Sequence, residues 1–288
     1  MKIGYAKRDV TPPIGVRLGG YGHRMGKPSE MVHDPLFASA LLIESSGDSL
    51  LFLHGDVLGV YKDFADSVKR RIHSGIGIEP GRIFFTTTHT HSGPETIVPM
   101  WPNTFPYDEQ EARILSDWEA AFAEAIVEAS VEANERALGG SISLGTSRAP
   151  DLTLNRTYKN NVIDDQIPFM ILSNGVQKVI VANYCCHPVC NTDSGISSDY
   201  PGALYAELDK LGFNCFFTTG PAGDVDPLGK GREFIANMGS QLCSAIVRES
   251  GNTYRVKEDV IGAERSKISL KMRYSKGLRQ ARARFKGI

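Results

Sequence analysis

Short apolar runs alternate with longer amphipathic segments along most of this chain. The short runs are rich in β-branched and aromatic residues, a composition typical of β-strands. They predict strands over the following ranges: Ala38–Ile43, Leu50–His54, Arg82–Thr87, Ser141–Gly145, Pro168–Leu172, Lys178–Tyr184 and Asn214–Thr218.

Apolar residues spaced three and four positions apart predict helices in the intervening segments. The predicted helices are Lys62–Ser74, Glu109–Ala137, Pro201–Leu211 and Gly231–Ser250, and the longest stops before the pair Gly139-Gly140. This alternation of strands and helices predicts an α/β fold, with a layered, mixed β-sheet flanked by helices. We see no internal repeat in the sequence.

The composition limits the class of protein. The chain has 288 residues, a net charge of -1 and 41% hydrophobic residues, enough for one large domain or two small ones. A near-zero charge gives no reason to expect a nucleic-acid partner. The N-terminus lacks the apolar stretch of a signal peptide, and no apolar run reaches the roughly 18 residues of a membrane span. We therefore expect a cytoplasmic protein without an integral membrane segment.

Cysteine usage points to a reducing compartment. The five cysteines are an odd number, and Cys185, Cys186 and Cys190 are crowded together, which is not the pattern of a disulfide framework. These three could bind zinc, but we favour small buried residues beside a strand end.

Basic residues gather near the C-terminus. Nine Lys or Arg and no acid occur between Arg265 and Lys286. A nucleic-acid or membrane tail is one interpretation. The alternating apolar residues Ile268, Leu270 and Met272 favour a strand with a solvated face instead.

Polar residues that could carry chemistry follow directly on four predicted strands. These residues are Asp56, the pair His89 and His91, His187, and the pair Asp224 and Asp226. In open α/β sheets, ligands bind outside the carboxyl ends of the strands. We therefore expect four loops at strand carboxyl ends to converge on one active site.

His89 and His91 are the strongest metal candidates. Alternate residues of an extended chain point to the same side, so both rings could face one ion. Catalytic zinc takes about three protein ligands plus a water whose pKa falls to about 7. Hydrogen-bonded filler histidines are the alternative, but a third histidine, His187, at another strand end favours a metal. His23, His33, His54 and His73 have weaker claims.

Three further features could serve such a site. Asp224 and Asp226 could bind a metal, act as a general base or bind hydroxyl groups, or they could only cap a turn. Arg156 could bind a carboxylate, stabilise an oxyanion or form an exposed salt bridge. The glycine-rich stretch "LGGYGHR" lacks a nucleotide-binding pattern and could let the backbone approach a pocket.

The order of the motifs resembles a known family. The stretches "RDVTPP", "GGYGHR", "HDPLFASALLIE", "THTHSGP", "NRTY", "DDQIPFMIL", "HPV" and "GDVDP" resemble the N-terminal catalytic domain of neutral/alkaline (non-lysosomal) ceramidases, from about Lys7 to Arg273. Those enzymes are zinc amidases that cleave the N-acyl bond of ceramide. The resemblance implies that His89 and His187 bind Zn²⁺. It also implies that His91 binds or protonates the substrate beside the metal and that Arg156 lies near the reacting carbonyl.

The chain departs from the family pattern in two ways. Asp226 stands where the family motif Gly-Asp-Val-Ser-Pro has a serine implicated in catalysis, so Asp226 or His91 would act as the base. The family's downstream glutamate and tyrosine ligands have no match, and Asp56, Asp199 or Asp224 could take their place. The resemblance implies a catalytic domain over residues 1–273, followed by a basic segment, 274–288, that could open a further region.

Our leading hypothesis is a zinc-dependent hydrolase that cleaves an amide, or an ester, with metal-activated water. Ceramide or a smaller polar amide would be the substrate. The alternative is an inactive homologue that binds a ligand or a partner. A barrel amidohydrolase, which also uses His-x-His, is less favoured because it usually needs two more histidines and an aspartate. The oligomeric state is not determined by the sequence.

Overall fold

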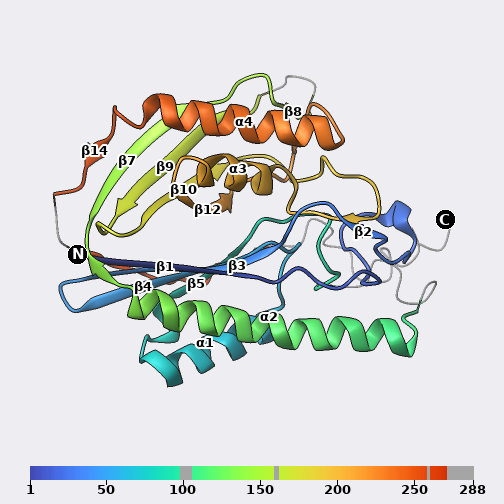
Figure 1. The fold of residues 1–288 in the computed structure, drawn as a ribbon, viewed down its shortest axis with the longest axis horizontal. Coiled ribbons are helices and arrows are strands. Elements are labelled where there is room, and N and C mark those ends of the chain that lie inside the picture. Colours follow the sequence, from blue (N-terminus) through green and yellow to red (C-terminus); the bar gives the residue numbers. More distant parts are fainter. Residues whose placement is uncertain (98–105, 159–161, 258–259, 271–288) are drawn as a thin grey trace.

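The protein is built of four layers, a helix layer, two β-sheets and a second helix layer (Figure 1). The computed structural model describes residues 1–97, 106–158, 162–257 and 260–270. Helices α1 (Lys62–Ile76) and α2 (Glu109–Glu135) cover the first sheet. Helices α3 (Asp199–Asp209) and α4 (Arg232–Glu249) cover the second. The predicted layered α/β fold is confirmed, with two sheets in place of one.

The first sheet has five strands in the order β5-β4-β3-β1-β6. Only β4 and β5 run parallel, and the other neighbours are antiparallel. The strands are β1 (Lys2–Asp9), β3 (Phe37–Ser45), β4 (Asp48–Gly55), β5 (Ile83–Thr87) and β6 (Leu138–Gly139).

The second sheet repeats the first. Its order is β12-β10-β9-β7-β14, and again only one pair, β10 and β12, is parallel. The fold therefore contains an internal repeat, a first half (residues 2–139) and a second half (residues 141–255), which the sequence did not show us. The strands are β7 (Ser141–Arg148), β9 (Gln166–Ser173), β10 (Lys178–Tyr184), β12 (Asn214–Thr219) and β14 (Tyr254–Arg255).

Each half also contains the same hydrogen bond at the equivalent position of its own sheet. Both β5 and β12 contain the letters FFTT. The Thr86 hydroxyl donates to the Leu53 carbonyl at 3.1 Å, and the Thr218 hydroxyl donates to the Ala182 carbonyl at 3.4 Å. So short a shared stretch gives little sequence signal, which is why the repeat is visible only in the fold.

Apolar side chains hold the layers together. Each sheet packs one face on its own helices and the other face on the opposite sheet. Burial of each large side chain is worth about 1.5–3 kcal/mol. The cluster between the sheets consists of Ile3, Tyr5, Leu41, Ile43, Ile142, Leu172, Val179 and Phe216.

The seven strands and four helices predicted between Ala38 and Ser250 are all present, most of them with shifted ends. Helix α2 begins with a capping box between Asp108 and Glu111 and ends at Glu135, before the double glycine. Strand β1 was not predicted, because Lys2, Lys7 and other charged residues obscure its apolar alternation. Two short strand pairs were also missed: β2 (Met31–Val32) with β11 (Gly195–Ile196), and β8 (Thr153–Asn155) with β13 (Val225–Pro227). One-turn 3₁₀ helices occupy Gly22–Arg24 and Pro80–Arg82.

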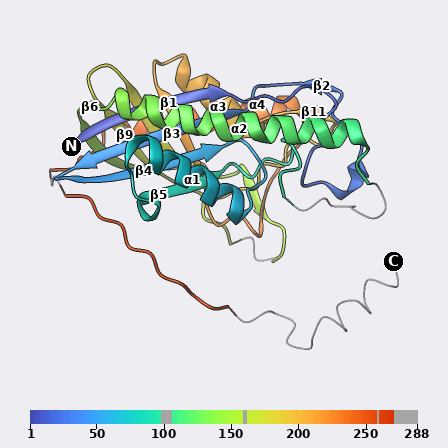
Figure 2. The same cartoon turned by 90° about the horizontal axis from the view of Figure 1, so that it is seen from below.

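The prediction about the cysteines is confirmed, whereas the prediction about the basic segment is wrong. All five cysteines are buried and free, and the burial predicted for Cys185, Cys186 and Cys190 is confirmed. The predicted basic strand is wrong as far as it is described: residues 260–270 form no strand, and Ile268 and Leu270 are exposed. Figure 2 shows this stretch leading away from the layers. Met272 and the segment 274–288 lie outside the described residues.

Candidate metal centre

The loops after β4, β5, β10 and β12 meet at one end of the two sheets. The Thr219 hydroxyl, at the end of β12, donates to the Thr88 carbonyl just past β5, at 2.6 Å. This bond joins the two halves where the parallel strands end. The convergence predicted from the sequence is therefore present, but the loops come from two sheets and not from one.

Three histidines face one another at this junction. Ring centroids lie 5.2 Å apart for His89 and His91, 5.1 Å for His89 and His187, and 5.7 Å for His91 and His187. One nitrogen from each ring lies within 4.8 Å of the others, a spacing that one metal ion could bridge. His89 and His91 belong to the first half and His187 to the second.

His89 and His187 are each oriented by a backbone carbonyl. The Nδ1 atom of His89 lies 2.6 Å from the Leu58 oxygen, and Nδ1 of His187 lies 2.5 Å from the Ala222 oxygen. A carbonyl oxygen only accepts, so each Nδ1 carries the proton and donates. The lone pair is then on Nε2, which is how metal-binding histidines are commonly held.

Within the part of the chain that the structure describes, His91 has no hydrogen-bond partner on either ring nitrogen, although both atoms are buried. Burial, followed by electrostatic interaction with His89 and His187, lowers the pKa of His91 from 6.5 to about 3. Burial also lowers the pKa of His187, with Arg156 adding to the effect. Both rings are therefore neutral at neutral pH, the form in which imidazole binds a metal.

The backbone places His89 in an unusual conformation. Strand β5 ends at Thr87, and His89 has a φ of 65°, in the left-handed region that non-glycine residues seldom occupy. The assumption that His89 and His91 lie on an extended chain is therefore wrong, although their rings do meet. The Thr90 hydroxyl donates to the Ser197 carbonyl at 2.8 Å and ties this turn to the second half.

The glycine-rich loop wraps around His91. Gly20 has a φ of 94°, and a β-carbon there would overlap the His91 ring. The Tyr21 ring lies 5.0 Å from the His91 ring, edge to face. Buried Arg24 donates to the His91 carbonyl and, at 3.1 Å, to the Ser92 hydroxyl. We predicted a close approach of this backbone to a pocket, but Tyr21 and Arg24 were not among our site residues.

Arg156 and Asp226 form an ion pair on the side of His187. The short strands β8 and β13 bring them together, with Nη1 and Oδ1 3.2 Å apart. The Arg156 guanidinium also donates to the Gly223 carbonyl from Nε and Nη2, at 3.2 and 2.8 Å. The His187 amide donates to the Val225 carbonyl at 3.0 Å, which fixes Asp226 next to the histidine loop.

The acids that we considered as further ligands make other contacts. Asp56 accepts from the Tyr205 hydroxyl at 3.0 Å, and Asp199 accepts from the Asn191 amide at 2.8 Å. Asp224 accepts from the Asn155 side chain at 2.9 Å. Among the residues that the structure describes, the three histidines are the one group of His, Cys, Asp or Glu spaced to hold a metal.

The remaining histidines have local partners. His54 lies 3.3 Å from Asp56, and His33 lies 2.8 Å from Asp193. His23 contacts the Thr192 carbonyl, and His73 is exposed on α1.

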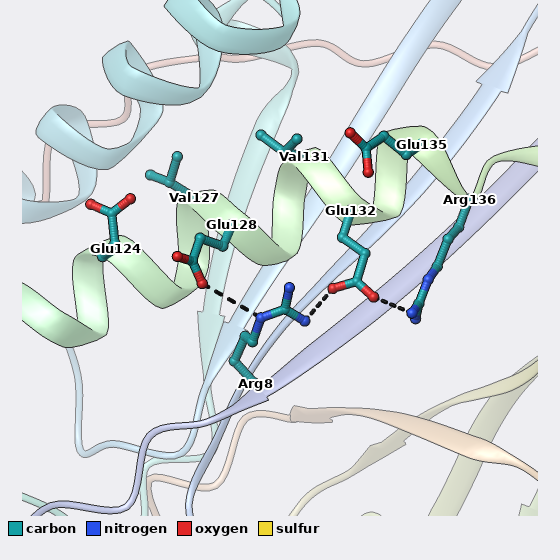
Figure 3. A pocket seen from close by; sticks show the side chains of 8 residues that line it. All are labelled: Arg8, Glu124, Val127, Glu128, Val131, Glu132, Glu135 and Arg136. Carbon is teal, nitrogen blue, oxygen red and sulfur yellow. Dashed lines mark ion pairs between the residues drawn. The ribbon is translucent and has the colours of Figure 1, made fainter.

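A wide hollow of about 580 Å³ lies elsewhere, between α2 and Arg8 of β1 (Figure 3). Its eight lining residues include four glutamates, and the ion pairs of Arg8 with Glu128 and Glu132 cross it. None of these residues belongs to the histidine loops, so this hollow is separate from the candidate centre.

Known structures share this fold. Neutral ceramidase from Pseudomonas aeruginosa matches 91% of this chain with a TM-score of 0.75 and 20% sequence identity, and the match covers 46% of that protein. A structure described as ceramidase complexed with C2 matches 91% of this chain with a TM-score of 0.75 and 19% sequence identity, and the match covers 45% of that protein. No family model and no curated protein matches the sequence.

These matches show that the chain has a ceramidase-like α/β fold and spans about half the length of the structures that it matches. The resemblance in the motifs is thus accompanied by a shared fold. No helix within the described residues is both long and apolar enough to cross a membrane.

Proposed function

We propose that this protein is a zinc-dependent hydrolase that cleaves an amide bond, or an ester bond, with water. The observation that supports the proposal most is the pair His89 and His187. Each ring donates Nδ1–H to a backbone carbonyl, which leaves the Nε2 lone pair for a metal, and the ring centroids lie 5.1 Å apart. Imidazoles that backbone carbonyls orient on two different loops suit Zn²⁺.

In the proposal, His89 and His187 hold the metal. A bound zinc would supply Lewis acidity toward the substrate carbonyl and would activate water for attack at neutral pH. Arg156 would orient the substrate carbonyl, because its guanidinium is fixed by the Gly223 carbonyl and Asp226. Asp226 would accept the proton of the attacking water and pass it to the leaving group.

His91 stands beside the metal in this scheme and contacts the substrate. Its two unpartnered nitrogens would equally let it act as a third metal ligand, and three histidines plus water form a familiar catalytic zinc set. Metal content separates the two roles, because the loss of a ligand lowers metal content and the loss of a substrate contact does not.

The proposed substrate is a small-molecule or lipid amide. The likeness to neutral ceramidase supports an N-acyl amide such as ceramide. Asp226 in place of the family serine supports a different proton path, and a smaller polar amide is consistent with it.

The test is metal content by mass spectrometry on the purified protein, beside His89→Ala, His91→Ala and His187→Ala. We expect close to one zinc per chain, lost in the His89 and His187 variants. Exposed His73→Ala is the matched control and should keep its metal. Little metal in the wild type, unchanged by any of these substitutions, would favour the alternative of a non-catalytic homologue.

A further inference from the structure

A buried polar network lies beneath the candidate metal centre, where the sheets of the two halves meet. Asp56, at the end of β4, is fully buried, and no cation of Lys or Arg pairs with it among the described residues. Its Oδ1 accepts from the Tyr205 hydroxyl at 3.0 Å, and its Oδ2 accepts from the Phe37 amide at 2.8 Å. His54 Nε2 lies 3.3 Å from Oδ1.

The bond between Asp56 and Tyr205 crosses between the halves. Asp56 belongs to the first half, whereas Tyr205 lies on α3 of the second. The Tyr205 side chain is almost wholly buried, and its hydroxyl is also 3.3 Å from His54 Nε2. A buried carboxylate is costly unless its hydrogen bonds are satisfied, so this contact fixes the end of β4 against α3.

The residues directly after Asp56 hold His89. The Val57 carbonyl accepts from the His89 amide at 3.0 Å. The Leu58 carbonyl accepts from His89 Nδ1 at 2.6 Å. A shift of the Asp56 backbone therefore moves both carbonyls that set the position and tautomer of His89.

The internal repeat shows that this network is not required by the architecture. Thr86 in the first half faces His54, and Thr218 at the equivalent place faces Asn183, with its hydroxyl 2.8 Å from the Asn183 amide. By the same register, the position of Asp56 corresponds to Cys185 in the second half. The second half thus forms the same strand ends without a buried carboxylate.

We propose that Asp56 and Tyr205 are positioning residues that set His89 relative to His187 across the two halves. The carboxylate anchors the loop 56–58 to α3, and the loop holds the His89 ring through the Leu58 carbonyl. The metal-affinity part of this inference rests on the proposed function, whereas the orientation of His89 in the metal-free protein does not.

The experiment compares Tyr205→Phe and Asp56→Asn with the wild type. The matched control is Tyr5→Phe, because Tyr5 is also buried and its hydroxyl also crosses between the halves, to the Cys215 carbonyl at 3.1 Å. Both tyrosine variants lose a buried hydroxyl that bonds across the halves, so both should lower the stability of the folded protein. Only the Tyr205 bond leads to the loop that holds His89.

Two readouts are used on each variant. The first is the zinc dissociation constant, measured in competition with a chromogenic chelator. The second is the proton resonance of His89 Nδ1–H in the metal-free protein, assigned by its disappearance in His89→Ala. We expect Tyr205→Phe to weaken zinc about tenfold, the low end for outer-shell partners of a metal ligand. Tyr205→Phe should also speed the exchange of the His89 Nδ1 proton with solvent. Tyr5→Phe should change neither the zinc affinity nor this exchange rate.

The inference is overturned if Tyr205→Phe and Asp56→Asn both keep the wild-type zinc affinity and the wild-type resonance. It is also overturned if Tyr5→Phe changes both readouts as much as Tyr205→Phe does. A wild type without zinc affinity would refute the proposed function, and the resonance would then decide the positioning role by itself. If Asp56→Asn does not fold, the milder Tyr205→Phe gives the answer.

Discussion

The rings of His89 and His187 lie with their centroids 5.1 Å apart, although the two residues belong to different halves of an internally repeated fold. Each ring is oriented by a carbonyl of its own half, Leu58 for His89 and Ala222 for His187. A metal bound by both would therefore link the halves, and this relationship leads to the first prediction.

Zinc should stabilise the folded protein. A ligand that binds only the folded state at 100 times its dissociation constant adds about 2.7 kcal/mol. In a domain of this size each kcal/mol raises the Tm by about 2–4 °C, so we expect a rise of about 5–10 °C. Calorimetry with and without zinc measures it. His187→Ala should show no such rise, and an equal rise in that variant would place the metal elsewhere.

Gly20→Ala should disturb the histidine cluster. Gly20 has a φ of 94°, and an added β-carbon would overlap the His91 ring. Gly77 is the matched control, because it has a similar φ of 75° but open space around its β-carbon position. Both variants should lose about 1 kcal/mol from backbone strain. Chemical unfolding should show a further loss, with weaker zinc binding, in Gly20→Ala alone, and equal losses would contradict the contact.

The metal-free protein should lose stability in acid through His91. Its pKa is about 3 in the folded state and 6.5 in the unfolded chain, so the unfolded state binds more protons between these values. The stability from this group is fully present above pH 6.5 and falls as the pH drops toward 3. Urea unfolding at several pH values should give a shallower fall for His91→Gln than for the wild type.

Exposed His73→Gln is the control for the acid experiment, because its ring lies on the surface of α1. It should follow the wild-type curve. The prediction fails if His91→Gln follows that curve as well.

Substitution of Arg156 or Asp226 should slow the reaction without unfolding the protein. Arg156→Lys loses the planar group that contacts both the Gly223 carbonyl and Asp226, and Asp226→Asn loses the proposed base. We expect each to lower kcat about 100-fold on a short-chain N-acyl amide. Steady-state kinetics measures the effect.

Arg8→Lys is the matched control for this pair, because Arg8 also pairs with an acid, Glu132, but between β1 and α2 and away from the histidine loops (Figure 3). Surface ion pairs of this kind contribute about 0–1 kcal/mol. Its kcat should equal that of the wild type. Activity retained by Arg156→Lys and Asp226→Asn would remove both residues from the mechanism.

Several parts of the fold were predictable because their signals are local. Strand β10 was predicted with its observed bounds, Lys178–Tyr184, from its apolar β-branched residues and the polar cluster that follows. Strand β1 was missed because its charged residues face solvent and helix α2, where Arg8 pairs with Glu132. The basic segment was wrongly predicted as a strand over Ile268 and Leu270, because alternation alone does not supply a neighbouring strand to pair with.

The candidate site also has features that the sequence indicates and features that it does not indicate. His89, His91, His187 and Asp226 were proposed as site residues from their motifs and from their places after predicted strands, and Arg156 was proposed from its motif. The structure brings the three histidines together. The sequence did not indicate the partners that orient them, such as Leu58, nor the loop residues Tyr21 and Arg24 that surround His91. These contacts join segments far apart in the chain, and no local pattern encodes them.

The sequence by itself determined the order of most of the longer strands and helices, the polar loops at strand ends and the residue types suited to a metal. The tertiary structure decided that these elements form two equivalent halves, with one histidine loop from each half meeting at their junction. The physical reason is that periodicity and turn residues act over a few positions. The pairing of the halves depends instead on burying the apolar faces of two sheets, Ile3 and Leu41 against Leu172 and Phe216, against each other.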